Sequence, residues 1–450
     1  MRKNSVNMLE GSLWKNILAF SIPVMLTGIL QLLFNACDLI VVGQFTNDSR
    51  ALAAVGATSS LTSLLVNAFM GLSVGVNVLA ARCFGAKDTE GIQNAVHTAV
   101  TLSLICGVVL SVLGIVICKP CLVAMNTPED VIDLSVLYMR IYFAGIPFTL
   151  LYNFCAAILR AHGNTKQPLI FLTIAGVVNV ALNVVLVAAF HLSVEGVAIA
   201  TAVSQLVASA LVIHYLREPG SVYFLDFRRL RVHWASFKEI LRVGIPAGMT
   251  SVLFAFSNIQ IQSSINIFGS VAMAGNAAAA SVDGFIYVTT NAFHHAALNF
   301  TGQNMGAGRG DRISKIMGVS LVYALVFGTV LSAVFYLFGE FFLGFYTKEA
   351  AAISYGMTRL LIVGLLYFLC GGFEVVIGVL RGMGYSVMPT IIVLVGVCGL
   401  RILWISTIFK AYLDYQVLLL SYPVSWLLTM MFSFVYYLFV AGKLKRKALQ

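Results

Sequence analysis

Four polar residues interrupt the first long apolar run at helical spacing. Thr27, Gln31, Asn35 and Asp38 are separated by four, four and three positions, so a helix places them on one face. Such a face is expected to line water or another helix. An aspartate within an apolar helix is costly and is therefore a functional candidate by default.

Two later apolar runs supply matching oxygen atoms. Asn179 and Asn183 lie four residues apart, and Thr201, Ser204 and Gln205 follow on the next run. Together with Asp38, these groups are ligands for a hard cation such as Na⁺. The same carboxylate in an apolar cavity is equally suited to carry a proton. Hydrogen bonds between helices explain the amides and hydroxyls, but they explain Asp38 poorly.

A second polar stripe lies in the other half of the chain. Its residues are spaced four, three and four apart: Asp283, Tyr287, Thr290 and His294. Asn258 and Gln262 share a face of the preceding run. Glu374 is expected either to pair with Arg401 or to take part in binding. His294 is expected either to titrate near neutral pH or to be packed.

Composition indicates an all-α membrane protein. The 450 residues are 60% apolar and 10% charged, and apolar stretches long enough to cross a bilayer recur throughout. We predict twelve membrane helices.

The net charge of +10 is distributed unevenly, since 21 Lys and Arg fall in loops on one side. Only Arg50, Lys119, Lys348 and Lys410 fall on the other. This bias places both termini in the cytoplasm and indicates the inner cell membrane rather than a nucleic-acid partner.

Internal repeats divide the chain into halves. Leu-Arg-x-x-Gly-x-x-x-x-Pro runs from Leu159 to Pro168 and recurs 221 residues later, from Leu380 to Pro389. Pro23 and Pro246 lie in a second repeated motif. We expect six-helix lobes at 1–216 and 243–450, joined by a basic cytoplasmic linker at 217–242. Because each lobe holds an even number of helices, a pseudo-two-fold axis along the membrane normal should relate them.

Motifs for enzymatic chemistry are missing from the sequence. There is no ATP-binding phosphate loop, zinc motif or nucleophile–histidine–acid set. The glycines at 306, 308 and 310 are expected to form a helix-end turn, like their counterpart at Gly85. Cys118 and Cys121 match a redox spacing but lie at the end of an apolar helix, where a chance pair is favoured over an external disulfide. We expect no enzyme activity and no cofactor.

These features together resemble the multidrug and toxic compound extrusion (MATE) transporters of the MOP superfamily, of bacterial type. The resemblance rests on the twofold six-helix plan, Ile22-Pro23, Gln31 to Asp38, and both Leu-Arg-x-x-Gly motifs. It also rests on the segment from Gly196 to Gln205. It implies two bundles that open alternately and export amphipathic, mostly cationic compounds against inward H⁺ or Na⁺.

The resemblance also implies a cation site in the amino-terminal lobe. The matching residues here are Asp38, Asn179, Asn183 and Thr201, with Asn153 facing the same cavity. Members of the DinF type often carry an acid where Asn183 stands, and NorM-type members carry one on the seventh helix, which this chain lacks. A role for Asp283 or Glu374 is therefore our own inference.

The sequence thus predicts a cation-coupled antiporter that works by alternating access, is monomeric, and contacts organic cations and membrane lipids. Its substrate cavity is expected to include a wider set of residues: Gln31, Asn35, Asn153, Gln205, Asn258, Gln262, Asp283, Tyr287, His294 and Glu374. The alternative is a flippase for lipid-linked precursors or polysaccharides from the same superfamily. Twelve helices and few intramembrane cations argue against that alternative.

Overall fold

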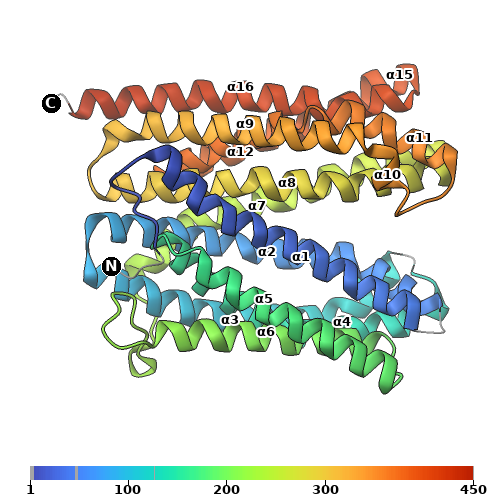
Figure 1. The fold of residues 1–450 in the computed structure, drawn as a ribbon, viewed down its shortest axis with the longest axis horizontal. Helices are drawn as coiled ribbons and strands as arrows, with labels where there is room; N and C mark the ends of the chain where they lie inside the picture. The colour runs from blue at the N-terminus through green and yellow to red at the C-terminus, as the bar shows by residue number, and fades with distance from the viewer. Residues whose placement is uncertain (1–4, 46–48, 126, 449–450) are drawn as a thin grey trace. The chain divides into compact units, whose positions relative to one another are not determined.

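The computed structural model describes residues 5–45, 49–125 and 127–448, and every regular element in these ranges is a helix (Figure 1). Eleven helical stretches of the described chain are long and apolar enough to span a membrane. One of them, Trp234–Gly306, holds 73 residues. A helix of that length would extend about 110 Å, so it must cross a ~30 Å bilayer core twice. The predicted all-α membrane fold is confirmed.

The chain forms two compact units. The first comprises Leu26–Gly248, and the second comprises Val6–Met25 and the residues from Met249 onward. The first unit contains α2 (Ser49–Ala86), α3 (Thr89–Ala124), α4 (Glu129–Ala161), α5 (Lys166–Asn183), the π-helix η1 (Val184–Ala189), α6 (Val194–Leu216) and the short 3₁₀ helix η2 (Phe227–Arg229).

The second unit has the same plan with more interruptions. It contains η3 (Asn266–Phe268), α8 (Gly269–Gly306), η4 (Gly310–Arg312), α9 (Ile313–Leu337), α10 (Gly339–Leu343), α11 (Ala350–Arg359), η5 (Leu360–Gly364), α12 (Tyr367–Gly382), α13 (Val387–Val393), η6 (Leu394–Gly399), α14 (Leu400–Trp404), η7 (Ile405–Phe409), α15 (Lys410–Tyr412) and α16 (Tyr415–Ala448). The π-helices η1 and η7 begin at 184 and 405, which is the spacing of the sequence repeat.

Two helices contribute to both units. In α1 (Leu13–Phe45) the division follows Met25, and in α7 (Trp234–Ile265) it follows Gly248. Each division lies two residues after a proline of the repeated motif, Pro23 or Pro246. Proline removes a helical hydrogen bond and favours a bend. The compact units therefore have other bounds than the predicted lobes, because the first turns of α1 pack with the second unit.

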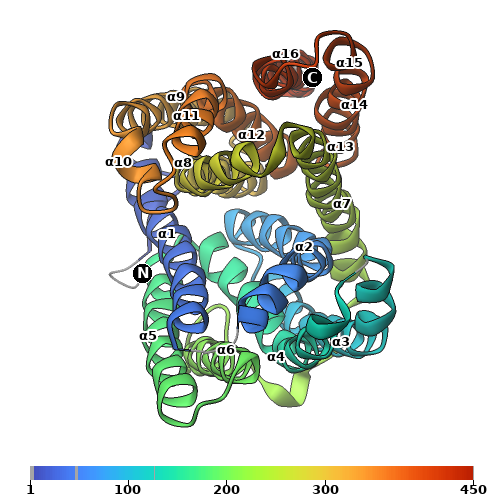
Figure 2. The same ribbon diagram turned by 90° about the vertical axis from the view of Figure 1, so that its right-hand side faces the viewer.

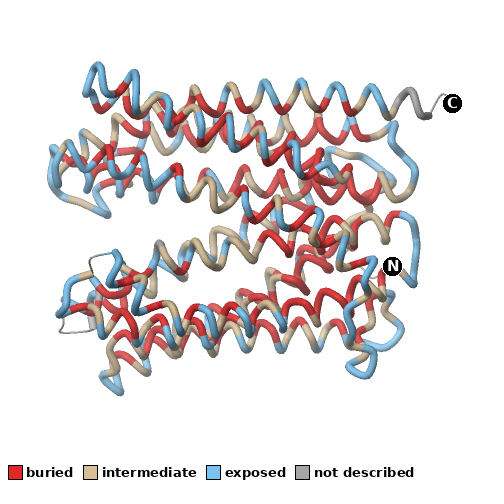
Figure 3. The backbone as a smooth tube through the Cα atoms, turned by 180° about the vertical axis from the view of Figure 1, so that it is seen from behind, coloured by how far each residue is buried: buried red, intermediate tan, exposed pale blue. Residues whose placement is uncertain are grey.

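Each unit has its own apolar core. In the first unit α3, α4 and α6 run side by side (Figures 1 and 2), and Phe143 and Phe154 of α4 are fully buried. In the second unit α8 packs against α9 and α12, with Phe293 and Phe373 buried. Figure 3 shows buried positions along the packed faces and exposed ones at the loops.

The repeated sequence motifs are helix ends. Gly163 has φ +93° and Gly384 has φ +86°, and each follows the last turn of a helix. Asn164 N donates to Leu159 O, and Tyr385 N donates to Leu380 O, both at 2.9 Å. This is the Schellman arrangement, which favours glycine at the left-handed position. Lys87 and Gly308 are left-handed in the same way, which confirms the predicted turn at the glycines near 306.

Small residues bring α2 and α7 into close contact within the first unit. Gly71 and Gly75 of α2 face Gly244 and Gly248 of α7, so each helix carries two glycines four residues apart. A methyl group at Gly71 would overlap the backbone of Gly248. Spacings of this kind are typical of tightly packed membrane helices.

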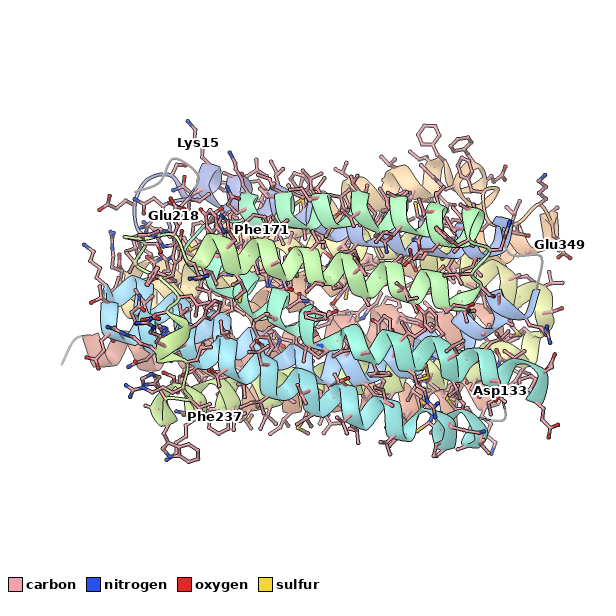
Figure 4. All side chains as sticks on the ribbon, turned by 90° about the horizontal axis from the view of Figure 1, so that it is seen from below. Lys15, Asp133, Phe171, Glu218, Phe237 and Glu349 are labelled. Atoms are coloured by element: carbon pink, nitrogen blue, oxygen red, sulfur yellow. The ribbon has the colours of Figure 1, made fainter. Side chains whose placement is uncertain are left out.

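The linker 217–242 is docked on the first unit. Leu225 is fully buried and Tyr223 is 3% exposed, both in the core of that unit. Gln93 donates to Val222 O at 2.7 Å, and Asp226 N donates to His97 Nε2 at 3.2 Å. In Figure 4 Glu218 and Phe237 lie at the end of this unit opposite Asp133.

Candidate cation site and buried charge networks

Three helices of the first unit bring the predicted cation ligands together. Asp38 comes from the second half of α1, Asn179 and Asn183 from α5, and Thr201 from α6. The four-residue spacing on α5 places both amides on the face that meets α1 and α6. Asn179 is 4% exposed and Asn183 is fully buried.

Hydrogen bonds connect all four side chains. Asn183 Nδ2 donates to Asp38 Oδ1 at 2.5 Å and lies 3.2 Å from Asn179 Oδ1. Thr201 Oγ1 donates to the other carboxylate oxygen, Oδ2, at 3.4 Å. Asn179 Nδ2 in turn donates to Thr201 Oγ1 at 3.4 Å. The carboxylate is therefore held from two helices, with the shorter contact coming from α5.

One oxygen atom of this cluster has no partner among the described residues. Asn183 Oδ1 is buried without a hydrogen bond. A buried carbonyl oxygen in that state is costly unless a ligand or water satisfies it. Asn183 also directly precedes the π-helix η1, a local distortion often found at functional sites. The cluster therefore offers a carboxylate and an open amide oxygen at one point.

The other residues predicted for this lobe make no hydrogen bond or ion pair with the cluster within the described part of the chain. Gln31 and Asn35 are exposed on α1, two turns and one turn before Asp38. Gln205 is half-buried one turn after Thr201. Asn153 is half-buried and donates to Thr149 O of its own helix at 2.8 Å, which is a structural contact.

In the second unit the predicted polar residues separate into groups. Asp283 Oδ2 lies 3.0 Å from Arg359 Nε, and both side chains are buried. Arg359 Nη1 donates to Asn276 Oδ1 at 2.9 Å, and Asn276 Nδ2 donates to Gln262 Oε1 at 3.2 Å. This chain links α7, α8 and α11 through alternating donors and acceptors. Tyr287, from the same predicted stripe as Asp283, is 40% exposed.

Two alternatives were expected for Glu374, and the one in which it pairs with Arg401 is wrong. Glu374 Oε2 lies 3.2 Å from His294 Nδ1 instead. Arg401 donates to Ser425 Oγ at 3.0 Å and to Asn258 Oδ1 at 3.2 Å, and its guanidinium lies over the Tyr422 ring. Among the described residues, the hydrogen-bond and ring partners of this arginine are hydroxyl, amide and aromatic groups of neighbouring helices, and none is a carboxylate. Of the two alternatives expected for His294, the structure shows the packed one: the side chain is buried and lies against Glu374.

Arg359 and Asn276 belong to the charge network but were not predicted as site residues. Arg359 lies in a predominantly apolar stretch of 33 residues, Ala350–Gly382. A charge at such a position needs a partner within the protein. The position of Arg359 within a membrane-spanning stretch was therefore the signal in the sequence that could have identified it. The two cysteines at 118 and 121 have free thiols, and Cys118 Sγ donates to Ile115 O at 3.1 Å.

Comparison with models of known protein families identifies the family of this chain. A family model described as MatE matches residues 23–185 and again 246–405. The chain belongs to the MATE family. The two matches begin at Pro23 and Pro246, so the family model detects the same internal repeat as the sequence motifs. MATE proteins are membrane transporters, so this chain is a multi-pass membrane protein of a transport family.

Relatives cover nearly the whole MATE chain. The probable multidrug resistance protein YoeA of Bacillus subtilis is 28% identical over 442 residues, covering 96% of this chain and 95% of the relative. The probable multidrug resistance protein NorM of Thermotoga maritima is 22% identical over 393 residues, covering 86% and 84%. An outward-facing multidrug resistance MATE transporter of the MOP superfamily has a TM-score of 0.92 at 21% identity, covering 99% and 100%. That similarity shows the same fold.

Proposed function

We propose that this protein exports amphipathic, mostly cationic organic compounds in exchange for inward movement of H⁺ or Na⁺. The cluster of Asp38, Asn179, Asn183 and Thr201 carries the proposal. A carboxylate within a membrane unit needs a function or a partner, and here its contacts are amides and a hydroxyl. Names of relatives, such as YoeA, support drug efflux.

The coupling step follows from differential binding. A cation at Asp38 neutralises the carboxylate and engages the open Asn183 oxygen, which favours one arrangement of α1, α5 and α6. The organic substrate favours another arrangement. Antiport requires only that the two ligands have different affinities for the two states. The Asp38 cluster would hold the cation as a transported substrate, and no further cofactor is needed.

We further propose an inner-membrane location with both termini in the cytoplasm, and a monomer as the transport unit. The excess of Lys and Arg on one side supports the orientation. The linker 217–242 then lies at the cytoplasmic surface, in agreement with its five exposed arginines, Arg217, Arg228, Arg229, Arg231 and Arg242.

The decisive experiment is efflux of a fluorescent cationic dye from proteoliposomes, with a proton or a sodium gradient imposed separately. One gradient should drive efflux in the wild type, and Asp38→Asn should abolish it. Asp133→Asn, an exposed carboxylate at the outer end of α4, is the matched control and should retain efflux. Normal coupled efflux in Asp38→Asn would overturn the proposed site. Lipid scrambling without dye flux would instead favour the flippase.

A further inference from the structure

Two apolar hollows lie next to each other on the first unit. The first has a volume of about 220 Å³ and is lined by α3, α4, α6 and the linker. The second has a volume of about 240 Å³ and lies between α4 and α6. Both are lined by Phe148 and Leu206, so they adjoin along the α4–α6 face. We call the two together the α4–α6 groove.

The groove is on the lipid side of α6, away from the cation site. At 100° per residue, Val203 and Leu206 point about 160° and 140° away from Thr201, which contacts Asp38. From Ile199 to Ile213 the groove follows α6 for about 21 Å. This exceeds the ~15 Å half-thickness of a bilayer core, so the groove has the length needed for one acyl chain.

The linker closes one end of the groove with a basic, aromatic segment. Phe227 and Leu230 line the first hollow. The Arg217 guanidinium lies 4.7 Å from the centre of the Phe227 ring, which places a positive charge at this end. Arg228 follows Phe227 in η2. Arg229 Nε lies 3.6 Å from Asp226 Oδ2 and forms an ion pair with it. Arg217 and Arg228 form no ion pair with any residue that the structure describes.

This end of the groove is held in place by α3. The linker backbone contacts three side chains of that helix: His97 accepts from Asp226 N, Thr98 accepts from His233 N, and Gln93 donates to Val222 O. A docked linker loses little freedom when a ligand binds, so its charges are available at low entropic cost.

We propose that the α4–α6 groove binds one acyl chain of an anionic phospholipid, with the headgroup phosphate at Arg217 and Arg228. The apolar walls fit the chain, and the two guanidiniums complement the phosphate. The nearby acids in the linker sequence are Glu218 and Asp226. They are outnumbered by four arginines, so this end of the groove is positively charged: Arg217, Arg228, Arg229 and Arg231. Basic pockets at the cytoplasmic ends of membrane helices recognise anionic headgroups in this way.

The test is lipid retention by the full-length protein in mild detergent, measured by native mass spectrometry with equal amounts of phosphatidylglycerol and phosphatidylcholine. The wild type should retain phosphatidylglycerol preferentially. Arg217→Gln and Arg228→Gln should each reduce that preference about fivefold, the typical effect of one basic residue at an anionic membrane surface. Ala210→Phe, which fills the groove, should reduce retention of both lipids. Arg242→Gln, an exposed arginine outside the groove, is the control and should behave as the wild type.

Several results would overturn the proposal. Equal retention of the two lipids by the wild type would show ordinary solvation by lipid. Unchanged retention in Ala210→Phe, with an unchanged melting temperature, would show that the chain lies elsewhere. Displacement of phosphatidylglycerol by glycerol phosphate alone, at similar concentration, would indicate an anion site without an acyl-chain component. None of these readouts depends on transport.

Discussion

Arg359 donates from Nε to Asp283 Oδ2 at 3.0 Å, across 76 residues of sequence and with both side chains buried. The guanidinium also lies 5.1 Å from the centre of the Tyr422 ring. The pair joins α8 to α11, while Tyr422 adds α16. Because neither charge is solvated, each depends on the other.

Asp283→Ala should therefore destabilise the protein strongly. Removing one member of a buried pair leaves the other charge without compensation and typically costs about 3–5 kcal/mol. The measurement is thermal unfolding in detergent, and Lys348→Gln, an exposed charge of the same unit, is the control. The double change Asp283→Leu with Arg359→Met should recover part of the loss. Equal melting temperatures for Asp283→Ala and the wild type would contradict a stabilising pair.

Within the cation site, the two helices should contribute unequally. Asn183 contacts Asp38 at 2.5 Å and has an open oxygen, whereas the Thr201 hydroxyl is 3.4 Å from the carboxylate. Asn183→Ala should reduce gradient-driven dye efflux about tenfold or more, as expected for losing a hydrogen bond to a charged group. Thr201→Val should have a smaller effect, and Asn94→Ala on α3 should have none. The reverse order would show that α6 holds the cation more closely than α5.

The glycine contact between α2 and α7 should tolerate no added methyl group. Gly71→Ala would place a methyl group against the Gly248 backbone, and overpacking of this kind typically costs about 1–3 kcal/mol. Gly56→Ala, also on α2, has open space around the new methyl group and should be neutral or slightly stabilising. Thermal unfolding of the two variants side by side tests the contact. Similar melting temperatures would indicate that α7 can shift to accommodate the methyl group.

The protein should lose stability as the pH falls, because His162 becomes protonated. This residue follows α4 and lies outside the membrane-spanning segment. Burial lowers the pKa of its imidazole below the ordinary value of 6.5. The ring packs between Phe84, 4.8 Å away, and Tyr223, 5.2 Å away. Since the folded-state pKa is the lower one, the unfolded chain binds the proton first. The stabilising contribution is complete above pH 6.5 and is lost as pH falls towards the folded-state value.

Replacing this histidine should make the pH dependence weaker. His162→Phe should reduce the drop in melting temperature between about pH 7 and pH 5, because the proton-binding group of the unfolded chain is removed. His214→Asn, an exposed histidine of α6, serves as the control. An unchanged pH profile in His162→Phe would assign the acid sensitivity to other groups.

Much of the architecture was set by local sequence patterns. Length and apolarity of each run determine a membrane helix, because backbone groups in lipid must pair within the segment. The glycines at 163 and 384 determine where two helices end, because a left-handed residue is needed there. Helical spacing also determined that Asn179 and Asn183 share a face.

Only the tertiary structure decided which faces meet. Periodicity gave no reason for Asp283 to select Arg359, or for Glu374 to lie beside His294 rather than Arg401. It did not show that Leu225 of the linker is buried, or that Val6–Met25 packs with the second unit. These contacts join segments far apart in the chain, so they depend on how whole helices pack, whereas spacing within one helix fixes only the residues that point the same way.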